Sequence, residues 1–134
     1  MLLEKFLDLL PTNFRHEKSL LIKQKLNDCR KLSQLSDVDI HNLQKGSLCT
    51  LNNLKKIRAI ATFIEKLEIS PPEAYVLLHC GVGSIKSLSR LNHYEVHARI
   101  GRLERSLRVK SATNITIYVL KGWIKRANEI CKYI

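Results

Sequence analysis

The chain has 134 residues, of which 45% are hydrophobic, and this composition is typical of a folded chain that forms one globular domain. No run of about 20 apolar residues is present, so we expect no transmembrane helix. The 23 lysines and arginines outnumber the 12 acidic residues and give a net charge of +11. This excess favours a polyanionic partner: nucleic acid, an anionic membrane or an acidic protein.

The first segment, MLLEKFLDLL, mixes charged and apolar residues, because Glu4, Lys5 and Asp8 interrupt the hydrophobic run. The central region of a signal peptide would be uncharged. We therefore expect a cytoplasmic protein. The segment carries more acid than base, which disfavours association with an anionic membrane.

The rest of the chain is expected to be all-α. Only three prolines and five glycines interrupt it, and its apolar residues mostly recur at intervals of three and four, as on one face of a helix. We expect about seven or eight mostly short helices in a single compact domain over residues 1–134.

An internal repeat pairs residues 36–57 with residues 70–91 at an offset of 34, from Ser36 to Ser70. Both copies begin with Ser-x-x-Asp/Glu, the capping box that satisfies the first amides of a helix. Each copy then leads into a second helix, for which the expected N-caps are Thr50 and Ser84.

Two further units resemble these copies less closely. One lies near residues 20–35 with Asp28 as its cap, and the other near residues 109–130 with Ser111 as its cap. The predicted fold is thus a tandem array of short units of the SAM-like or helix-hairpin-helix type, followed by a longer amphipathic C-terminal helix.

The turn in LLHCGVGSIKSL carries the first candidate site. In a helix-hairpin-helix unit, Gly81 and Gly83 would form the turn between two helices, and the amides of Gly83, Ser84 and Ile85 would bind a DNA phosphate beside the charge of Lys86. The alternative is structural: Gly81 ends one helix and Gly83 is a turn residue.

A basic stretch follows this turn. It consists of Arg99, Arg102, Arg105, Arg108 and Lys110. These side chains either follow a phosphate backbone or form a solvated helix face with Glu95 and Glu104 as local partners. A further cluster, Lys55, Lys56 and Arg58, would widen such a patch.

The C-terminal helix is expected to bury a stripe that comprises Ile115, Val119, Trp123, Ala127 and Ile130. Within it, Trp123 is expected to anchor the core, and the alternative is that it anchors a partner.

Catalysis and metal binding find no motif in this chain. The four cysteines lack any C-x-x-C pairing, and no nucleophile elbow, phosphate-binding P-loop or His-Glu-x-x-His motif is present. We expect no enzyme activity, no metal, no cofactor and no small-molecule substrate.

Three stretches resemble a known family in the same order: LLHCGVGSIKSLSRLN, VHARIGRLERSLRVK and ITIYVLKGWIKRANEI. The family consists of small uncharacterised proteins common in cyanobacteria, a domain of unknown function related to helix-hairpin-helix proteins. The resemblance runs from about Leu35 onward, and its most specific part is Trp123, Ile124 and Ala127. It implies a compact all-α body of repeated hairpins. The Asn-, Lys- and Ile-rich composition suits an AT-rich genome, so the plastid stroma is the alternative compartment if the gene is plastid-encoded.

The preferred function is that of a nucleic-acid-binding module, with DNA favoured, that contacts phosphates without reading bases. The alternative is a protein adaptor whose basic face docks an acidic partner, with the hairpins serving only as architecture.

Overall fold

The computed structural model describes residues 7, 10, 12–107 and 115–132, and no strand occurs among them. Eight α-helices and one short 3₁₀ helix make up this part of the chain, which confirms the all-α prediction. In chain order they are η1 (Thr12–Phe14), α2 (Arg15–Lys23), α3 (Cys29–Ser33), α4 (Asp37–Gln44), α5 (Leu51–Leu67), α6 (Pro71–His79), α7 (Ile85–Ser89), α8 (His93–Leu107) and α9 (Ile117–Cys131).

Both predicted capping boxes are present. At the start of α4, the amide of Asp39 donates to Oγ of Ser36 at 3.1 Å, and the amide of Ser36 donates to Oδ2 of Asp39 at 3.0 Å. At the start of α6, the amide of Ser70 donates to Oε1 of Glu73 at 2.9 Å, and the amide of Glu73 donates to Oγ of Ser70 at 3.3 Å. Each box satisfies two amides that the first turn of a helix leaves without a partner.

Three other predicted N-caps are confirmed as well. Asp28 accepts from the amide of Arg30 at 2.7 Å, Thr50 from that of Asn53 at 3.1 Å, and Ser84 from that of Ser87 at 3.0 Å. The cap predicted at Ser111 lies outside the described residues. The last helix, α9, begins after Thr116, whose hydroxyl accepts from the amide of Val119 at 3.2 Å.

The helix bounds reveal a second internal register. Helices α2, α3 and α4 begin at residues 15, 29 and 37, and α6, α7 and α8 begin 56 residues later, at residues 71, 85 and 93. Helices α2 and α6 have nine residues each, and α3 and α7 have five each. We call helices α2 to α5 unit 1 and helices α6 to α9 unit 2.

The 56-residue register explains burial that the offset of 34 does not. That offset pairs Leu48 with Val82, yet Leu48 is 77% exposed and Val82 is completely buried. At the offset of 56, the partner of Val82 is Leu26, which packs against the core from partial burial. The helix boundaries therefore follow the longer register.

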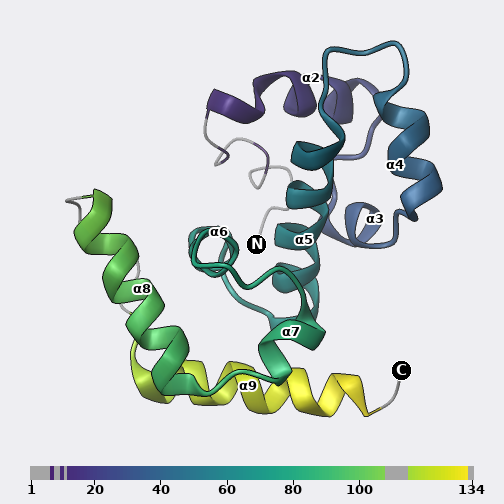
Figure 1. Cartoon of the computed structure of the whole chain (residues 1–134). Coiled ribbons are helices and arrows are strands. Elements are labelled where there is room, and N and C mark those ends of the chain that lie inside the picture. The colour runs from purple at the N-terminus through teal and green to yellow at the C-terminus, as the bar shows by residue number, and fades with distance from the viewer. Residues whose placement is uncertain (1–6, 8–9, 11, 108–114, 133–134) are drawn as a thin grey trace.

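The two units use the same internal packing. The short helix α3 lies on α5 in unit 1, and the short helix α7 lies on α9 in unit 2. Figure 1 shows α5 running down the centre of the molecule, with α6 beside it and α9 crossing below its end. Contacts of α5 with α6 and α9 join the units into one body with one continuous core.

Helix α5 supplies much of that core. Over its 17 residues it buries seven: Leu54, Ile57, Ile60, Ala61, Phe63, Ile64 and Leu67. Helix α9 buries Leu120, Trp123 and Ala127, so Trp123 is a core residue as predicted. The prediction for Val119 was wrong, because it is exposed and its neighbour Leu120 faces the core instead.

Unit 1 contains a buried carboxylate that ties α2 to the start of α5. Glu17 is only 1% exposed. Its Oε2 accepts from the amide of Thr50 at 3.0 Å, and its Oε1 accepts from Nδ2 of Asn53 at 3.2 Å. A carboxylate is favoured there because the first amides of a helix carry a partial positive charge.

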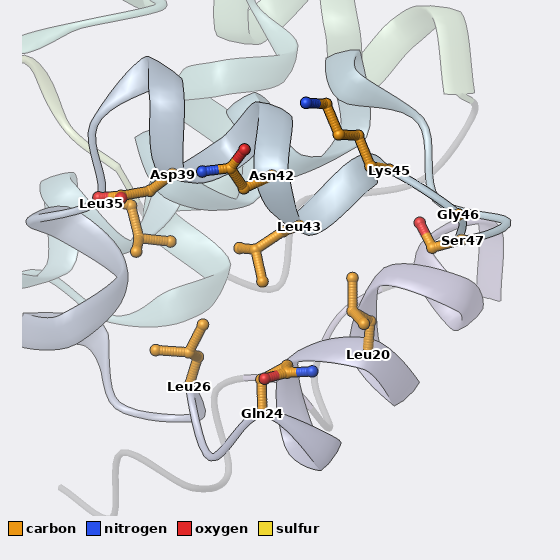
Figure 2. Close-up of a pocket in the computed structure, with 10 residues that line it drawn as sticks. All are labelled: Leu20, Gln24, Leu26, Leu35, Asp39, Asn42, Leu43, Lys45, Gly46 and Ser47. Atoms are coloured by element: carbon orange, nitrogen blue, oxygen red, sulfur yellow. The ribbon is translucent and has the colours of Figure 1, made fainter.

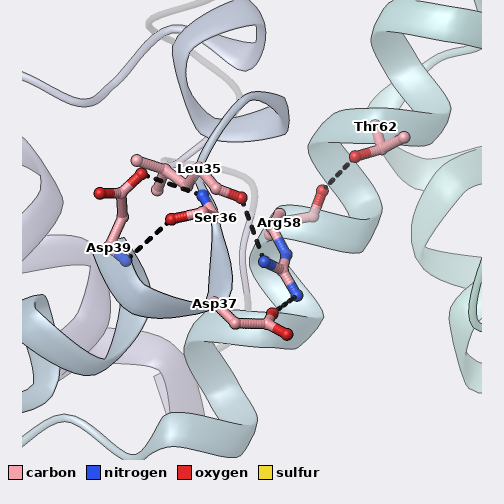
Figure 3. Close-up of polar contacts among 6 residues, drawn as sticks. All are labelled: Leu35, Ser36, Asp37, Asp39, Arg58 and Thr62. Carbon is pink, nitrogen blue, oxygen red and sulfur yellow. Dashed lines mark hydrogen bonds and ion pairs between the residues drawn. The ribbon is translucent and has the colours of Figure 1, made fainter.

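Arg58 ties α5 to the connection between α3 and α4 (Figure 3). Its Nη1 donates to the carbonyl oxygen of Leu35 at 3.1 Å, and its Nη2 lies 2.9 Å from Oδ1 of Asp37. The guanidinium lowers the pKa of Asp37 below its usual value of 3.8 through a hydrogen bond and charge attraction. Arg58 therefore serves an internal contact and does not join a free basic patch with Lys55 and Lys56.

Candidate nucleic-acid interface

The turn between α6 and α7 is built by the backbone. The amide of Gly81 donates to the carbonyl of Leu78 at 3.1 Å, and the amide of Val82 donates to that of Leu77 at 3.1 Å. This pair of hydrogen bonds is the Schellman motif, which ends a helix with one residue at positive φ. Gly81 has φ +95°, so the glycine is required there, and Val82 fills the core behind the turn as predicted.

The backbone that follows the turn presents free donors. Within the described residues, the amides of Gly83, Ser84, Ile85 and Lys86 have no acceptor. Gly83, Ser84 and Lys86 are exposed, while the side chain of Ile85 is buried. Successive backbone amides that point outward form a concave site suited to an anion.

Gly83 lacks a structural reason of its own. A Cβ atom placed there would meet nothing within 4 Å, and its φ does not lie in the left-handed region. The protein itself thus leaves room for a side chain beside the free amides. This open space is compatible with close approach of an external group to the backbone.

The equivalent turn of unit 1 has the same geometry and different chemistry. The amide of Lys25 donates to the carbonyl of Ile22 at 3.0 Å, and that of Leu26 donates to Leu21 at 2.8 Å. Lys25 takes the position of Gly81 at φ +59°, and the cap is the carboxylate of Asp28. A negative charge at the cap opposes an anion, so only the turn of unit 2 suits a phosphate.

The structure brings Arg99 next to that turn. A Cβ atom on Gly81 would lie 3.5 Å from Nη1 of Arg99, and Nη2 lies 2.9 Å from Oε1 of Glu95, the local partner expected from the sequence. Burial raises the pKa of the Cys80 thiol, and the charge of Arg99 opposes that rise. Arg99 is therefore a half-buried cation at the edge of the turn.

The other predicted cations are distributed differently. Arg102 and Arg105 are exposed on α8, with no carboxylate partner among the described residues. Steps of three residues turn by about 60° around a helix, so these side chains fan out from the Arg99 side of α8 instead of forming one row. Arg108 and Lys110 lie outside the described residues.

Sequence reasoning missed the relation between the two turns. The signal is present at the offset of 56, where Leu21 aligns with Leu77 and Leu32 with Leu88. Among residues 12–107 and 115–132, no group of three or more His, Cys, Asp or Glu side chains is placed to hold a metal ion. In the same part of the chain, no helix combines the length and apolarity needed to cross a membrane.

A family described as Domain of unknown function (DUF4332) matches residues 11–130. No curated protein and no solved structure matches the chain.

Proposed function

We propose that this chain, which belongs to the family of the Domain of unknown function (DUF4332), is a non-enzymatic module that binds the phosphate backbone of DNA at the turn between α6 and α7. In this proposal α6, the turn and α7 act as a helix-hairpin-helix unit. The expected compartment is the cytoplasm, or the plastid stroma if the gene is plastid-encoded.

One observation supports this function above the others: four consecutive amides, of residues 83–86, are without an acceptor in the described part of the chain. Hydrogen bonds from backbone amides to phosphate oxygens position a protein on DNA without reading sequence. The exposed side chain of Lys86 and the half-buried Arg99 add positive charge on either side of these amides.

Arg102 and Arg105 extend the positive surface along α8. Contacts of this kind are electrostatic, so affinity should fall steeply as salt releases fewer counterions. DNA binding of this type would not distinguish sequences.

The test is a fluorescence anisotropy titration with labelled duplex and single-stranded DNA at about 50 mM and about 200 mM salt. We expect binding at low salt that weakens strongly at high salt and does not depend on sequence. Absence of binding at low salt would overturn the proposal and favour the alternative, an adaptor whose basic face docks an acidic protein.

Gly83→Asp tests the location of the site. It places a carboxylate beside the free amides in open space, and we expect at least about a tenfold loss of DNA affinity. The matched control is Gly122→Asp, because Gly122 also has nothing within 4 Å of its Cβ position and lies exposed on α9. Equal losses in both variants would show an effect of net charge and would exclude the turn as the site.

A further inference from the structure

Unit 1 has an open apolar groove between α2 and α4, with a volume of about 520 Å³. Four half-buried leucines face one another across it: Leu20, Leu26, Leu35 and Leu43. Figure 2 shows Leu43 of α4 opposite Leu20 and Leu26, with open space between them. The groove is on unit 1 and so lies apart from the turn proposed to bind phosphate.

The same place in unit 2 carries different side chains. At the offset of 56, Leu43 corresponds to Arg99 and Asp39 to Glu95. In unit 2, Arg99 pairs with Glu95 at 2.9 Å and lies over the Gly81 turn. In unit 1 the leucine forms no such pair, and Asp39 instead caps its own helix through Ser36. Unit 1 therefore exposes apolar surface where unit 2 presents a paired cation.

The groove has one wall that is held in place. The carbonyl of Leu35 accepts the hydrogen bond from Nη1 of Arg58 at 3.1 Å, which fixes the connection between α3 and α4 against α5. Beyond Ser47 of the opposite rim, Leu48 is 77% exposed. Exposed apolar surface beside an apolar groove is typical of a site that binds another protein.

The charges around the groove indicate the partner. Lys45 lies on its rim, and Lys23 and Lys25 are exposed beside Gln24, which also lines it. Asp39 is the carboxylate among the lining residues, and its Oδ2 accepts from the amide of Ser36. A second copy of this chain carries the same charge of +11, so electrostatic repulsion disfavours self-association through this surface.

We propose that the groove of unit 1 binds an acidic amphipathic helix of another protein. Apolar side chains on one face of that helix, spaced by three and four residues, would insert between the leucines of α2 and α4, as in other helix-in-groove complexes. Its flanking acidic residues would face Lys23, Lys25 and Lys45. This inference does not depend on the DNA-binding proposal.

The probe is a fluorescein-labelled helical peptide with leucines on one face and glutamates on the other, titrated with the full chain by anisotropy. We expect binding that weakens with salt, and no binding by a peptide in which lysines replace the glutamates. Equal binding of both peptides, or no binding of the acidic peptide at about 1 mM protein, would overturn the proposal.

Leu43→Arg is the decisive variant, because it gives unit 1 the Asp-x-x-x-Arg spacing that Glu95 and Arg99 have in unit 2. We expect at least about a tenfold loss of peptide affinity and unchanged DNA affinity. Val38→Arg is the matched control: it adds the same charge to α4 at a residue that is 68% exposed and does not line the groove. Equal peptide affinity in the Leu43→Arg variant and the unchanged protein would exclude the groove.

Lys45→Glu provides a test that does not alter the apolar walls, because Lys45 is exposed. We expect weaker peptide binding whose deficit shrinks at high salt. Sedimentation of the chain alone addresses the remaining occupant. A dimer that dissociates on Leu43→Arg would show that a second copy fills the groove, and would overturn the assignment to an acidic partner.

Discussion

Oε2 of Glu17 accepts a hydrogen bond from the amide of Thr50, 33 residues away, at 3.0 Å. Through this contact a buried carboxylate in α2 serves the first turn of α5, the helix that supplies much of the core. A buried charge is retained in this way when fixed donors replace the water that it loses. The connection between α2 and α5 is therefore polar although both helices bury apolar faces.

The first prediction concerns this carboxylate. Glu17→Ala leaves the Thr50 amide and the Asn53 side chain without their acceptor, and should lower the free energy of unfolding by about 1–3 kcal/mol. Urea denaturation followed by circular dichroism measures this change. Glu129→Ala, at an exposed residue of α9, is the control and should change stability by less than about 0.5 kcal/mol. A Glu17→Ala variant as stable as the control would contradict a structural role for the buried contact.

The second prediction is a pH dependence at Asp37. Arg58 lowers the pKa of this carboxyl in the folded state, so the pair stabilises the fold above the unfolded pKa, and the stabilisation is lost as pH falls through the folded pKa. Asp37→Asn should therefore lower the urea midpoint slightly at neutral pH. The difference from the unchanged protein should disappear in strong acid, and a difference that persists there would mean that the charge of Asp37 is not its cause.

The third prediction compares the two equivalent turns. Gly81→Ala places a side chain at φ +95° and should lower the free energy of unfolding by about 1–2 kcal/mol. Lys25→Gly removes a side chain from φ +59° and should leave stability unchanged or raise it by up to about 1 kcal/mol. Thermal unfolding of both variants checks the pair. The same sign of change in both would be inconsistent with the shared turn geometry.

The fourth prediction concerns thiol reactivity. Burial, together with the charges of Asp28 and Glu65, raises the pKa of Cys29 to about 11, so only about 0.1% of this thiol is ionised at pH 8. Cys29 and Cys49 are buried, whereas Cys80 and Cys131 are half-buried. Iodoacetamide labelling read by mass spectrometry should modify Cys80 and Cys131 first, and should modify Cys29 only in denaturant. Rapid labelling of Cys29 in the native protein would contradict its placement.

The sequence predicted the helix starts well because capping is local. Ser36 with Asp39, and Ser70 with Glu73, lie three residues apart, and the chemistry of each pair is legible without knowledge of the fold. The candidate turn was located for the same reason, since a glycine at positive φ ends a helix wherever that helix packs.

Features that depend on tertiary contacts were not predictable in this way. Arg58 has the sequence context of a surface cation, and its internal role depends on Leu35 and Asp37, which precede it by about two dozen residues. Val119 fits the helical period of the last stripe, but the actual rotation of α9 places Leu120 on the core. The 56-residue register was obscured because functional positions differ most between the units, as at Leu43 and Arg99.

That shared register also has a historical meaning. Three helices that recur in order, with matched starts and two matched lengths, are the pattern left when a gene segment is copied in tandem and both copies remain in one reading frame. The ancestral product would have been a half-length chain that buried its apolar faces against an identical partner. Fusion made the two halves independent in sequence, and the leucine at residue 43 and the arginine at residue 99 record how far they have since diverged.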